Sequence, residues 1–188
     1  MGIVIGMDEV GRGCWAGPLV AGAVALPATI AGLNDSKLLS KLQRESLAEQ
    51  IHALAHVGLG WVSSSEVDDL GLTKAVALAM RRALDELQKL GNEVIESILI
   101  DGNFNFLPEL TNTRAIIGGD KLEPAISAAS IVAKVARDAY MAELALQHPG
   151  YGFESHVGYG TAQHKLALEK FGVLSHHRKS YKPIQAFL

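Results

Sequence analysis

The most constraining feature of this sequence is a short apolar run that leads directly into two adjacent acids. Residues 2–13 read GIVIGMDEVGRG, in which the apolar residues 3–5 predict a buried strand and Asp8 and Glu9 follow at its end. Neighbouring carboxylates at the end of a core strand repel each other and resist removal from water. A bound cation offsets both costs, so the run indicates a cation site where the first strand ends.

The remainder of the chain alternates between strand-like and helix-like segments. Strands are predicted at residues 3–8, 19–26, 59–63, 97–101 and 115–117, and helices at 41–56, 73–90, 125–147 and 161–171. Ser40 and Thr161 are residue types that cap helix N-termini. Strands first, followed by alternating helices and strands, predict an α/β sandwich with a helical C-terminal appendage. We expect one domain over residues 1–188, with residues 148–188 as the appendage.

Composition excludes several classes of protein. Hydrophobic residues make up 48% and charged residues 20% of the chain, which is ordinary for a soluble globular protein and wrong for a disordered one. The opening apolar run is far shorter than the roughly 20 residues of a membrane span, and no basic region precedes it. Cys14 is the only cysteine, so an internal disulfide and a cysteine-rich zinc site are both excluded. We therefore expect a cytoplasmic protein with no membrane association.

Positive charge gathers at the C-terminal end, although the whole chain has a net charge of −3. Against Glu169 alone, residues 164–188 carry the cations Lys165, Lys170, Arg178, Lys179 and Lys182. Such a pattern is equally typical of a solvated basic tail and of a surface that grips nucleic acid.

Three sites along the chain place acids where predicted strands end. Asp8 ends the first strand with Glu9 directly after it, Asp101 ends the strand at 97–101, and Asp120 comes two glycines after the strand at 115–117. Residues just past strand ends line the ligand crevice of a sheet that is covered on both faces. Carboxylate oxygens are the ligands that Mg²⁺ and Mn²⁺ prefer, and a pair of such ions can drive phosphoryl displacement. Turn formation or helix capping by these acids remains the alternative.

The glycines around Arg12 allow more than one interpretation. GRGCWA formally matches the dinucleotide-binding pattern G-x-G-x-x-G/A, but that pattern requires a helix to follow at once. Here Pro18 and the β-rich run LVAGAVAL follow, so a nucleotide-dependent oxidoreductase is disfavoured. Gly11 and Gly13 let the backbone approach a sugar or phosphate closely while Arg12 reaches a phosphate, and a plain turn is equally compatible.

The motifs together resemble the bacterial ribonuclease HII family. They are DEVGRG, GPLVAGAV, NDSK, LIDGN, GD, ISAASIVAKVARD, GYGT and HHRKS, in the family's order and at similar spacings, from residue 4 to residue 181. The resemblance implies a ribonuclease H-like fold, a central mixed sheet flanked by helices. It also implies an endonuclease that cuts 5′ of ribonucleotides by two-metal-ion catalysis with Mn²⁺ or Mg²⁺, leaving a 3′-hydroxyl and a 5′-phosphate.

The resemblance assigns roles residue by residue. The acids that match the family's catalytic metal ligands are Asp8, Glu9, Asp101 and Asp120. The residues that match its substrate contacts are Gly11, Arg12 and Gly13 for the ribose 2′-hydroxyl, Tyr159 for a deoxyribose, and Lys37 for a phosphate. The implied substrates are RNA–DNA hybrids and DNA duplexes that contain ribonucleotides, handled by a monomer in ribonucleotide excision repair.

The chain departs from the family pattern at three positions. Leu38, Gly118 and Val157 stand where relatives often carry lysine, so we expect a weaker grip on the duplex. Two other functions are less compatible with the sequence. In a catalytically silent nucleic-acid-binding module, the four acids would repel the phosphates of the nucleic acid. A generic two-metal phosphatase has no use for a segment that reads a 2′-hydroxyl.

Overall fold

A five-stranded mixed sheet forms the centre of the molecule in the computed structural model, which describes residues 2–28, 30–34, 36, 38–89 and 94–188. The strands are β1 (Ile3–Val10), β2 (Leu19–Ala25), β3 (His56–Val62), β4 (Ile95–Asp101) and β5 (Thr113–Ile116), in the spatial order β3-β2-β1-β4-β5. β1 runs antiparallel to β2 and parallel to β4, and β4 runs parallel to β5. The C-terminal ends of β1 and β4 therefore meet at one edge of the sheet.

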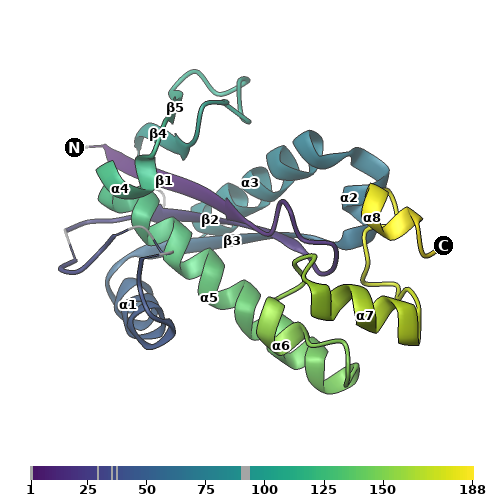
Figure 1. Cartoon of the computed structure of the whole chain (residues 1–188). Helices are drawn as coiled ribbons and strands as arrows, with labels where there is room; N and C mark the ends of the chain where they lie inside the picture. The colour runs from purple at the N-terminus through teal and green to yellow at the C-terminus, as the bar shows by residue number, and fades with distance from the viewer. Residues whose placement is uncertain (1, 29, 35, 37, 90–93) are drawn as a thin grey trace.

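Helices cover both faces of the sheet, as expected for an α/β sandwich. Helix α3 (Leu72–Gln88) packs on one face, and α5 (Pro124–Gln147) and α1 (Lys41–Leu54) pack on the other (Figure 1). Two apolar cores result, one between the sheet and α3 and the other between the sheet, α5 and α1. The ribonuclease H-like arrangement predicted from the sequence is confirmed at this level.

Small residues bring α5 unusually close to the two central strands. A Cβ atom on Gly6 of β1 would overlap the backbone of Ala125, and one on Gly22 of β2 would lie 2.5 Å from the carbonyl oxygen of Ala129. The helix therefore rests directly on the backbone of β1 and β2, with alanine in its first turns. This close packing fixes the height of Ser130 on α5 above the end of β1.

Some element boundaries differ from those predicted. β1 continues through Asp8 and Glu9 to Val10, because β2 still pairs with it there, so both acids lie within the strand and not beyond it. α1 is capped by Ser40 as expected but ends at Leu54, and His56 begins β3. Helix α2 (Ser64–Leu70) was not predicted, although Ser63 and its partner three residues later form a capping box at its start.

The C-terminal elements gather at one end of α5, close to α2 (Figure 1). They are α6 (Phe153–His156), α7 (Ala162–Phe171) and α8 (Lys182–Gln185), while α4 (Gly119–Leu122) lies at the other end of the sheet. α7 begins at the predicted cap, where the Thr161 side chain accepts a hydrogen bond from the His164 amide. Among the described residues, no helix combines the length and apolar character needed to cross a bilayer.

Candidate active site

A cavity of about 430 Å³ opens where β1 and β4 end. Its wall combines sheet residues with residues from α1, α5 and the C-terminal appendage. They are Asp8, Glu9, Val10, Gly11, Arg12, Gly13, Ser36, Arg44, Asp101, Ser130, Lys134 and Tyr159. Of the residues singled out in the sequence, three of the four acids, the whole glycine–arginine–glycine segment and the GYGT tyrosine are thus brought to one cavity.

Asp8 is the most strongly perturbed of these acids. Burial, followed by the negative charges of Glu9 and Asp101, raises the pKa of Asp8 to about 8. Two hydrogen bonds act in the opposite direction, one from the Glu9 amide at 2.8 Å and one with the Ser130 hydroxyl. The Ser130 hydroxyl in turn lies 2.9 Å from that of Ser36. The carboxylate is therefore oriented by the protein, and no cation of the described residues forms an ion pair with it.

Glu9 has a cationic neighbour that Asp8 lacks. Its carboxylate lies 3.0 Å from the Arg12 guanidinium, in an ion pair three residues apart. Burial raises the pKa of Glu9, and the charge of Arg12 opposes that rise. Because half of the Arg12 side chain is exposed, this ion pair contributes little to stability, and the guanidinium is accessible to a ligand.

Asp101 and Asp120 are connected through the backbone. A carboxylate oxygen of Asp101, at the end of β4, accepts a hydrogen bond from the Asp120 amide at 3.3 Å. Asp120 itself is buried at the start of α4 and does not line the cavity. Within the described part of the chain, no group of three or more acidic, histidine or cysteine side chains is arranged to hold a metal ion as it stands.

The glycine loop after β1 is held by a buried arginine of α5. Gly11 has φ +91°, and a Cβ atom there would overlap the Arg137 side chain. Arg137 is fully buried and donates hydrogen bonds to three backbone oxygens, those of Pro18 at 2.8 Å, Val157 at 2.9 Å and Ala16 at 3.2 Å. The single guanidinium thus ties the loop to the appendage, and glycine at position 11 leaves room for it.

A second buried arginine holds the same loop from the C-terminal segment. Arg178 donates to the carbonyl oxygens of Arg12 at 2.9 Å and Gly17 at 3.1 Å. The sequence left Arg178 in a basic tail that is either solvated or grips nucleic acid, but Arg178 is fully buried and its guanidinium donates to backbone carbonyls instead. Within the described residues, no carboxylate lies within ion-pair distance of Arg137 or Arg178. Two uncompensated positive charges therefore lie beneath the loop.

Tyr159 is positioned by a chain of histidines in the appendage. Its ring is 43% exposed, and its carbonyl oxygen accepts a hydrogen bond from His164 Nδ1 at 2.9 Å. His164 Nε2 lies 3.0 Å from His177 Nε2, and His177 Nδ1 accepts from the Leu174 amide. These contacts fix the tautomers, since each ring has one donor and one acceptor nitrogen in use. Burial lowers the pKa of both His164 and His177 to about 4, so both stay neutral.

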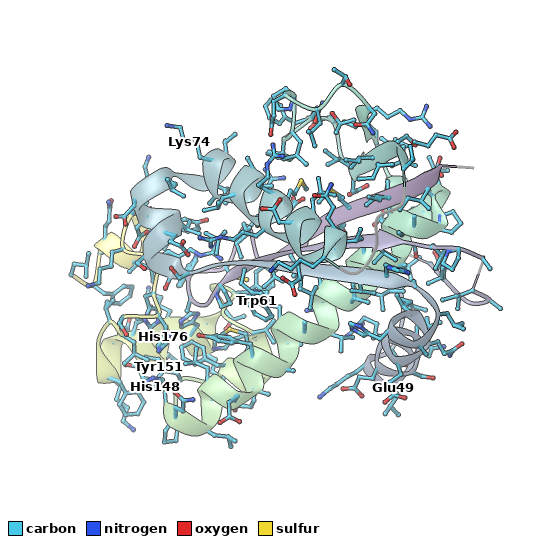
Figure 2. The ribbon with its side chains drawn as sticks, turned by 180° about the vertical axis from the view of Figure 1, so that it is seen from behind. Glu49, Trp61, Lys74, His148, Tyr151 and His176 are labelled. Atoms are coloured by element: carbon cyan, nitrogen blue, oxygen red, sulfur yellow. The ribbon has the colours of Figure 1, made fainter. Side chains whose placement is uncertain are left out.

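Further rings support this histidine chain. His156 stacks on His164 with ring centroids 4.5 Å apart, and Tyr151 stacks on Phe153 at 5.4 Å. In Figure 2, Tyr151 lies together with His148 and His176 on one side of the molecule. The centre of the appendage is therefore a packed aromatic cluster in which the ring nitrogens of His156, His164 and His177 have hydrogen-bond partners. Sequence spacing gave no signal for it.

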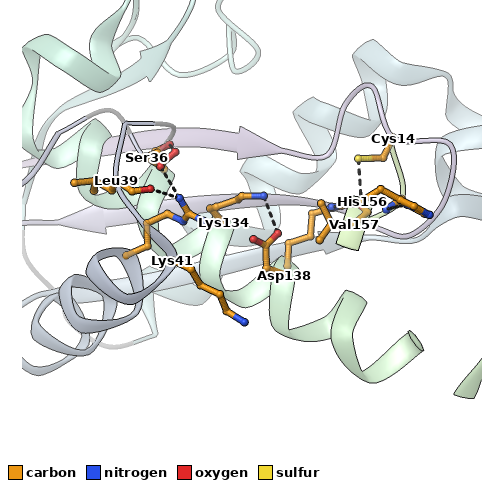
Figure 3. A network of polar contacts seen from close by, with 12 residues as sticks. Cys14, Ser36, Leu39, Lys41, Lys134, Asp138, His156 and Val157 are labelled. Carbon is orange, nitrogen blue, oxygen red and sulfur yellow. Dashed lines mark hydrogen bonds and ion pairs between the residues drawn. The ribbon is translucent and has the colours of Figure 1, made fainter. Parts of the chain in front are cut away.

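Cations from two helices, Arg44 and Lys134, also line the cavity, and Figure 3 shows the polar contacts of Lys134 and Ser36. Arg44 of α1 donates to the carbonyl oxygens of Ser36 and Leu39, which pins the loop before α1. Lys134 of α5 forms an ion pair with Asp138, one turn further along the same helix, at 2.8 Å. Ser36 and Lys134 belong to recognised motifs, whereas no sequence signal pointed to Arg44.

Lys37, the proposed phosphate contact, lies outside the described residues. The three departures from the family pattern, Leu38, Gly118 and Val157, occupy different environments. Leu38 is 68% exposed. Gly118 has φ +67° in open space, and Val157 has φ +43° with its half-buried side chain packed on the apolar cluster of the appendage. A lysine is accommodated without backbone strain only at position 38, because the other two positions have the left-handed conformation.

The sequence matches a model of the family described as Ribonuclease HII over residues 5–184. Ribonuclease HII of Jannaschia sp. is 50% identical over 190 residues, which cover 100% of this chain and 93% of the relative. Ribonuclease HII of Dichelobacter nodosus is also 50% identical over 190 residues, covering 99% of this chain and 97% of the relative. Both similarities extend over the whole length of the chain.

Solved structures share the fold. Ribonuclease HII in a PCNA complex from Archaeoglobus fulgidus superposes with a TM-score of 0.76 at 26% identity, covering 96% of this chain and 95% of that one. Ribonuclease H2 from Pyrococcus horikoshii OT3 gives 0.80 at 22% identity, with 98% and 96% covered. Bst-RNase HIII in complex with Mn²⁺ gives 0.78 at 18% identity, with 97% and 68% covered.

The family match and the relatives agree with the motifs that meet at the cavity. The site acids, the glycine–arginine–glycine segment and the tyrosine come from motifs spread between residues 8 and 161, and the family match spans all of them. The chain therefore belongs to the ribonuclease HII family, whose members are endonucleases that hydrolyse the RNA of RNA–DNA hybrids.

Proposed function

We propose that this ribonuclease HII cuts the phosphodiester on the 5′ side of ribonucleotides, both in RNA–DNA hybrids and where one ribonucleotide is embedded in duplex DNA. The observation that supports this most directly is one cavity that holds Asp8, Glu9 and Asp101 together with Gly11–Gly13 and Tyr159. Carboxylates supply the chemistry, and bare backbone next to an aromatic ring supplies a surface for a ribose.

The donor set of the cavity fits hard divalent ions. Asp8, Glu9 and Asp101 offer only carboxylate oxygens, and burial with mutual repulsion already raises the pKa of Asp8 to about 8. We propose that these three residues, with Asp120 beside Asp101, hold two Mg²⁺ or Mn²⁺ ions once substrate is bound. When bound, the ions activate a water and stabilise the charge on the leaving oxygen. Substrate phosphate oxygens complete the coordination that the protein alone leaves open.

The chain's own residues position the substrate for this reaction. The amides of Gly11 and Gly13 approach the 2′-hydroxyl, because neither residue has a side chain to block it. Arg12 reaches a neighbouring phosphate, and the buried charges of Arg137 and Arg178 make the loop favourable for an anion. Attack of water on phosphorus breaks its bond to the 3′-oxygen, which leaves a 3′-hydroxyl and a 5′-phosphate.

Residues 148–188 are proposed to grip the duplex beyond the cleavage point. Lys165, Lys170, Lys179 and Lys182 are exposed there, and each can neutralise a backbone phosphate. Lys37 is also proposed to contact a phosphate. We propose that the protein acts as a monomer in the cytoplasm, where its chromosomal substrate lies.

Product mapping tests the proposal. A duplex with one ribonucleotide is incubated with the protein and Mg²⁺, Mn²⁺ or a chelator, and the ends of the products are identified. We expect a single cut 5′ of the ribonucleotide, with a 3′-hydroxyl and a 5′-phosphate, and none with chelator. A cut at another position, or products that form in chelator, would contradict it.

A further inference from the structure

A second cavity adjoins the first one and is not used by the roles assigned so far. It measures about 230 Å³ and is lined by the loop after β4, including Gly102, Asn103 and Phe104, and by Thr73 at the start of α3. Arg12 and Asp101 line both cavities. Tyr159 borders only the first cavity and Phe104 only the second, so each is an aromatic ring next to the shared pair.

Phe104 is exposed on a loop that is otherwise held in place. Its ring is 52% exposed, and its edge meets the buried ring of Phe106 with centroids 4.8 Å apart. The Asn105 side chain ties the loop to β5 and to the next turn, donating to the Thr113 hydroxyl at 2.7 Å and accepting from the Leu107 amide at 2.9 Å. A large apolar ring is therefore presented to solvent by an ordered loop at the edge of the active site.

The neighbouring charges define what such a ring can contact. The Arg12 guanidinium lies 5.8 Å from the centroid of Phe106, so a cation that can bind phosphate stands beside the exposed ring. In an intact duplex the faces of the bases are covered by their neighbours, whereas the sugars present apolar C–H surface at the wide minor groove of A-form helices. The aromatic ring can therefore contact a sugar while Arg12 binds the phosphate next to that sugar.

We propose that Phe104 packs against a sugar of the substrate backbone, across the shared Arg12 and Asp101 from the sugar held by Tyr159. The inference rests on the proposed function, because it assumes that a nucleic acid occupies the first cavity. The two rings then bracket the scissile phosphate, and Phe104 sets how tightly the flanking nucleotide is held, independently of base sequence.

Binding of a one-ribonucleotide duplex to Phe104 variants tests this, with Ca²⁺ replacing Mg²⁺ to prevent cleavage. Phe104→Ala should raise Kd about tenfold, within the range measured for aromatic contacts to single nucleotides, while Phe104→Tyr should bind like the wild type. Phe104→Met keeps an apolar contact with Phe106 but loses the flat surface, so it should resemble Phe104→Ala. Tyr140→Ala is the matched control, since Tyr140 is an exposed aromatic outside both cavities and should leave Kd unchanged.

Truncated duplexes separate a direct contact from an indirect one. The duplex is shortened step by step from each end in separate series. In one of the two series, the difference in Kd between wild type and Phe104→Ala should disappear once the contacted sugar is removed. Equal Kd values for Phe104→Met and wild type, or a difference that survives truncation from both ends, overturns the inference. Failure of the wild type to cleave the full-length one-ribonucleotide duplex in Mg²⁺ would instead refute the proposed function.

Discussion

Where β1 and β4 end, Asp8, Glu9 and Asp101 share a cavity, and within the described residues Arg12 alone forms an ion pair with one of them. Beneath Tyr159, by contrast, every ring nitrogen of His164 and His177 has a hydrogen-bond partner. Both regions are polar and largely buried. In the first, burial raises the pKa of Asp8, because the charged form lacks compensation. In the second, burial lowers the histidine pKa values and keeps the rings neutral.

This difference indicates that the two regions have different roles. The acid region retains an electrostatic cost that a cation can relieve, which is typical of a functional site. The histidine region has no such cost, and its hydrogen bonds hold Tyr159 and the glycine loop at fixed positions. Substitutions in the first region should therefore change activity with little loss of stability, and substitutions in the second should do the reverse.

The largest expected effect is the loss of cleavage when an acid of the cavity is neutralised. Asp8→Asn and Asp101→Asn should each reduce kcat by about a thousandfold or more, because metal-ion stabilisation of the transition state is worth several kcal/mol. Cleavage of a one-ribonucleotide duplex in Mg²⁺ measures this. Asp85→Asn, at an exposed position of α3, is the matched control and should retain full activity. Substantial Mg²⁺-dependent activity in either variant would remove that acid from the site.

In the histidine region the largest effect should be on stability. His164→Ala creates a cavity and leaves the Tyr159 carbonyl and a His177 nitrogen without their partners, at a cost of about 2–4 kcal/mol in the free energy of unfolding. Denaturant unfolding measures the change. His52→Ala, on the exposed face of α1, should cost less than about 0.5 kcal/mol. If both variants are equally stable, the histidine chain does not hold the appendage.

The two regions should also respond to pH with opposite signs in the chelated protein. The folded pKa of Asp8, about 8, lies above its unfolded value of 3.8, so its contribution falls as pH rises towards 8. The histidines have folded pKa values of about 4 against 6.5 unfolded, so theirs falls as pH drops below 6.5. Between pH 6.5 and 8, the free energy of unfolding of the wild type should decline because of Asp8. The decline should be about 1–2 kcal/mol smaller in Asp8→Asn. An unchanged decline in the variant would refute the shift at Asp8.

The smallest expected effect concerns the missing lysines. Leu38→Lys should steepen the dependence of log K on log salt by up to about 0.9, because one more phosphate is neutralised. A salt titration of duplex binding in Ca²⁺ measures the slope, with Val94→Lys as the control, because Val94 is exposed just before β4, at the end of that strand away from the cavity. Gly118 is unsuitable for this test because its left-handed backbone adds strain to a lysine, and Val157 is unsuitable because its side chain packs on the apolar cluster of the appendage. Equal slopes for both variants would mean that position 38 does not face the duplex.

Much of the acid region could be predicted from the sequence, because it depends on local patterns. An apolar run that ends in acids marks Asp8, Glu9 and Asp101, and a serine cap marks the start of α1. The end of β1 was placed too early, since strand pairing with β2 outweighs the repulsion between adjacent acids. Local propensity carries no information on that competition.

The histidine region could not be predicted, because it depends on contacts between distant segments. His164 and His177 lie 13 residues apart and meet only after α7 folds back on the last loop. Arg178 was counted among the cations of a basic tail, since charge pattern alone does not show that it donates hydrogen bonds to backbone carbonyls of the glycine loop. Such burial becomes visible only in the tertiary structure.

The most direct test of the metal site is the melting temperature of the wild type and of Asp8→Asn, each with chelator and with saturating Mn²⁺. The variant should melt at the same temperature as the wild type or higher in chelator, because one source of repulsion is gone. Mn²⁺ at about 100 times its Kd should stabilise the wild type by about 2.7 kcal/mol, or roughly 5–10 °C, and the variant by much less. Equal Mn²⁺ shifts in the two proteins, or a variant that melts well below the wild type in chelator, would contradict a metal site at Asp8.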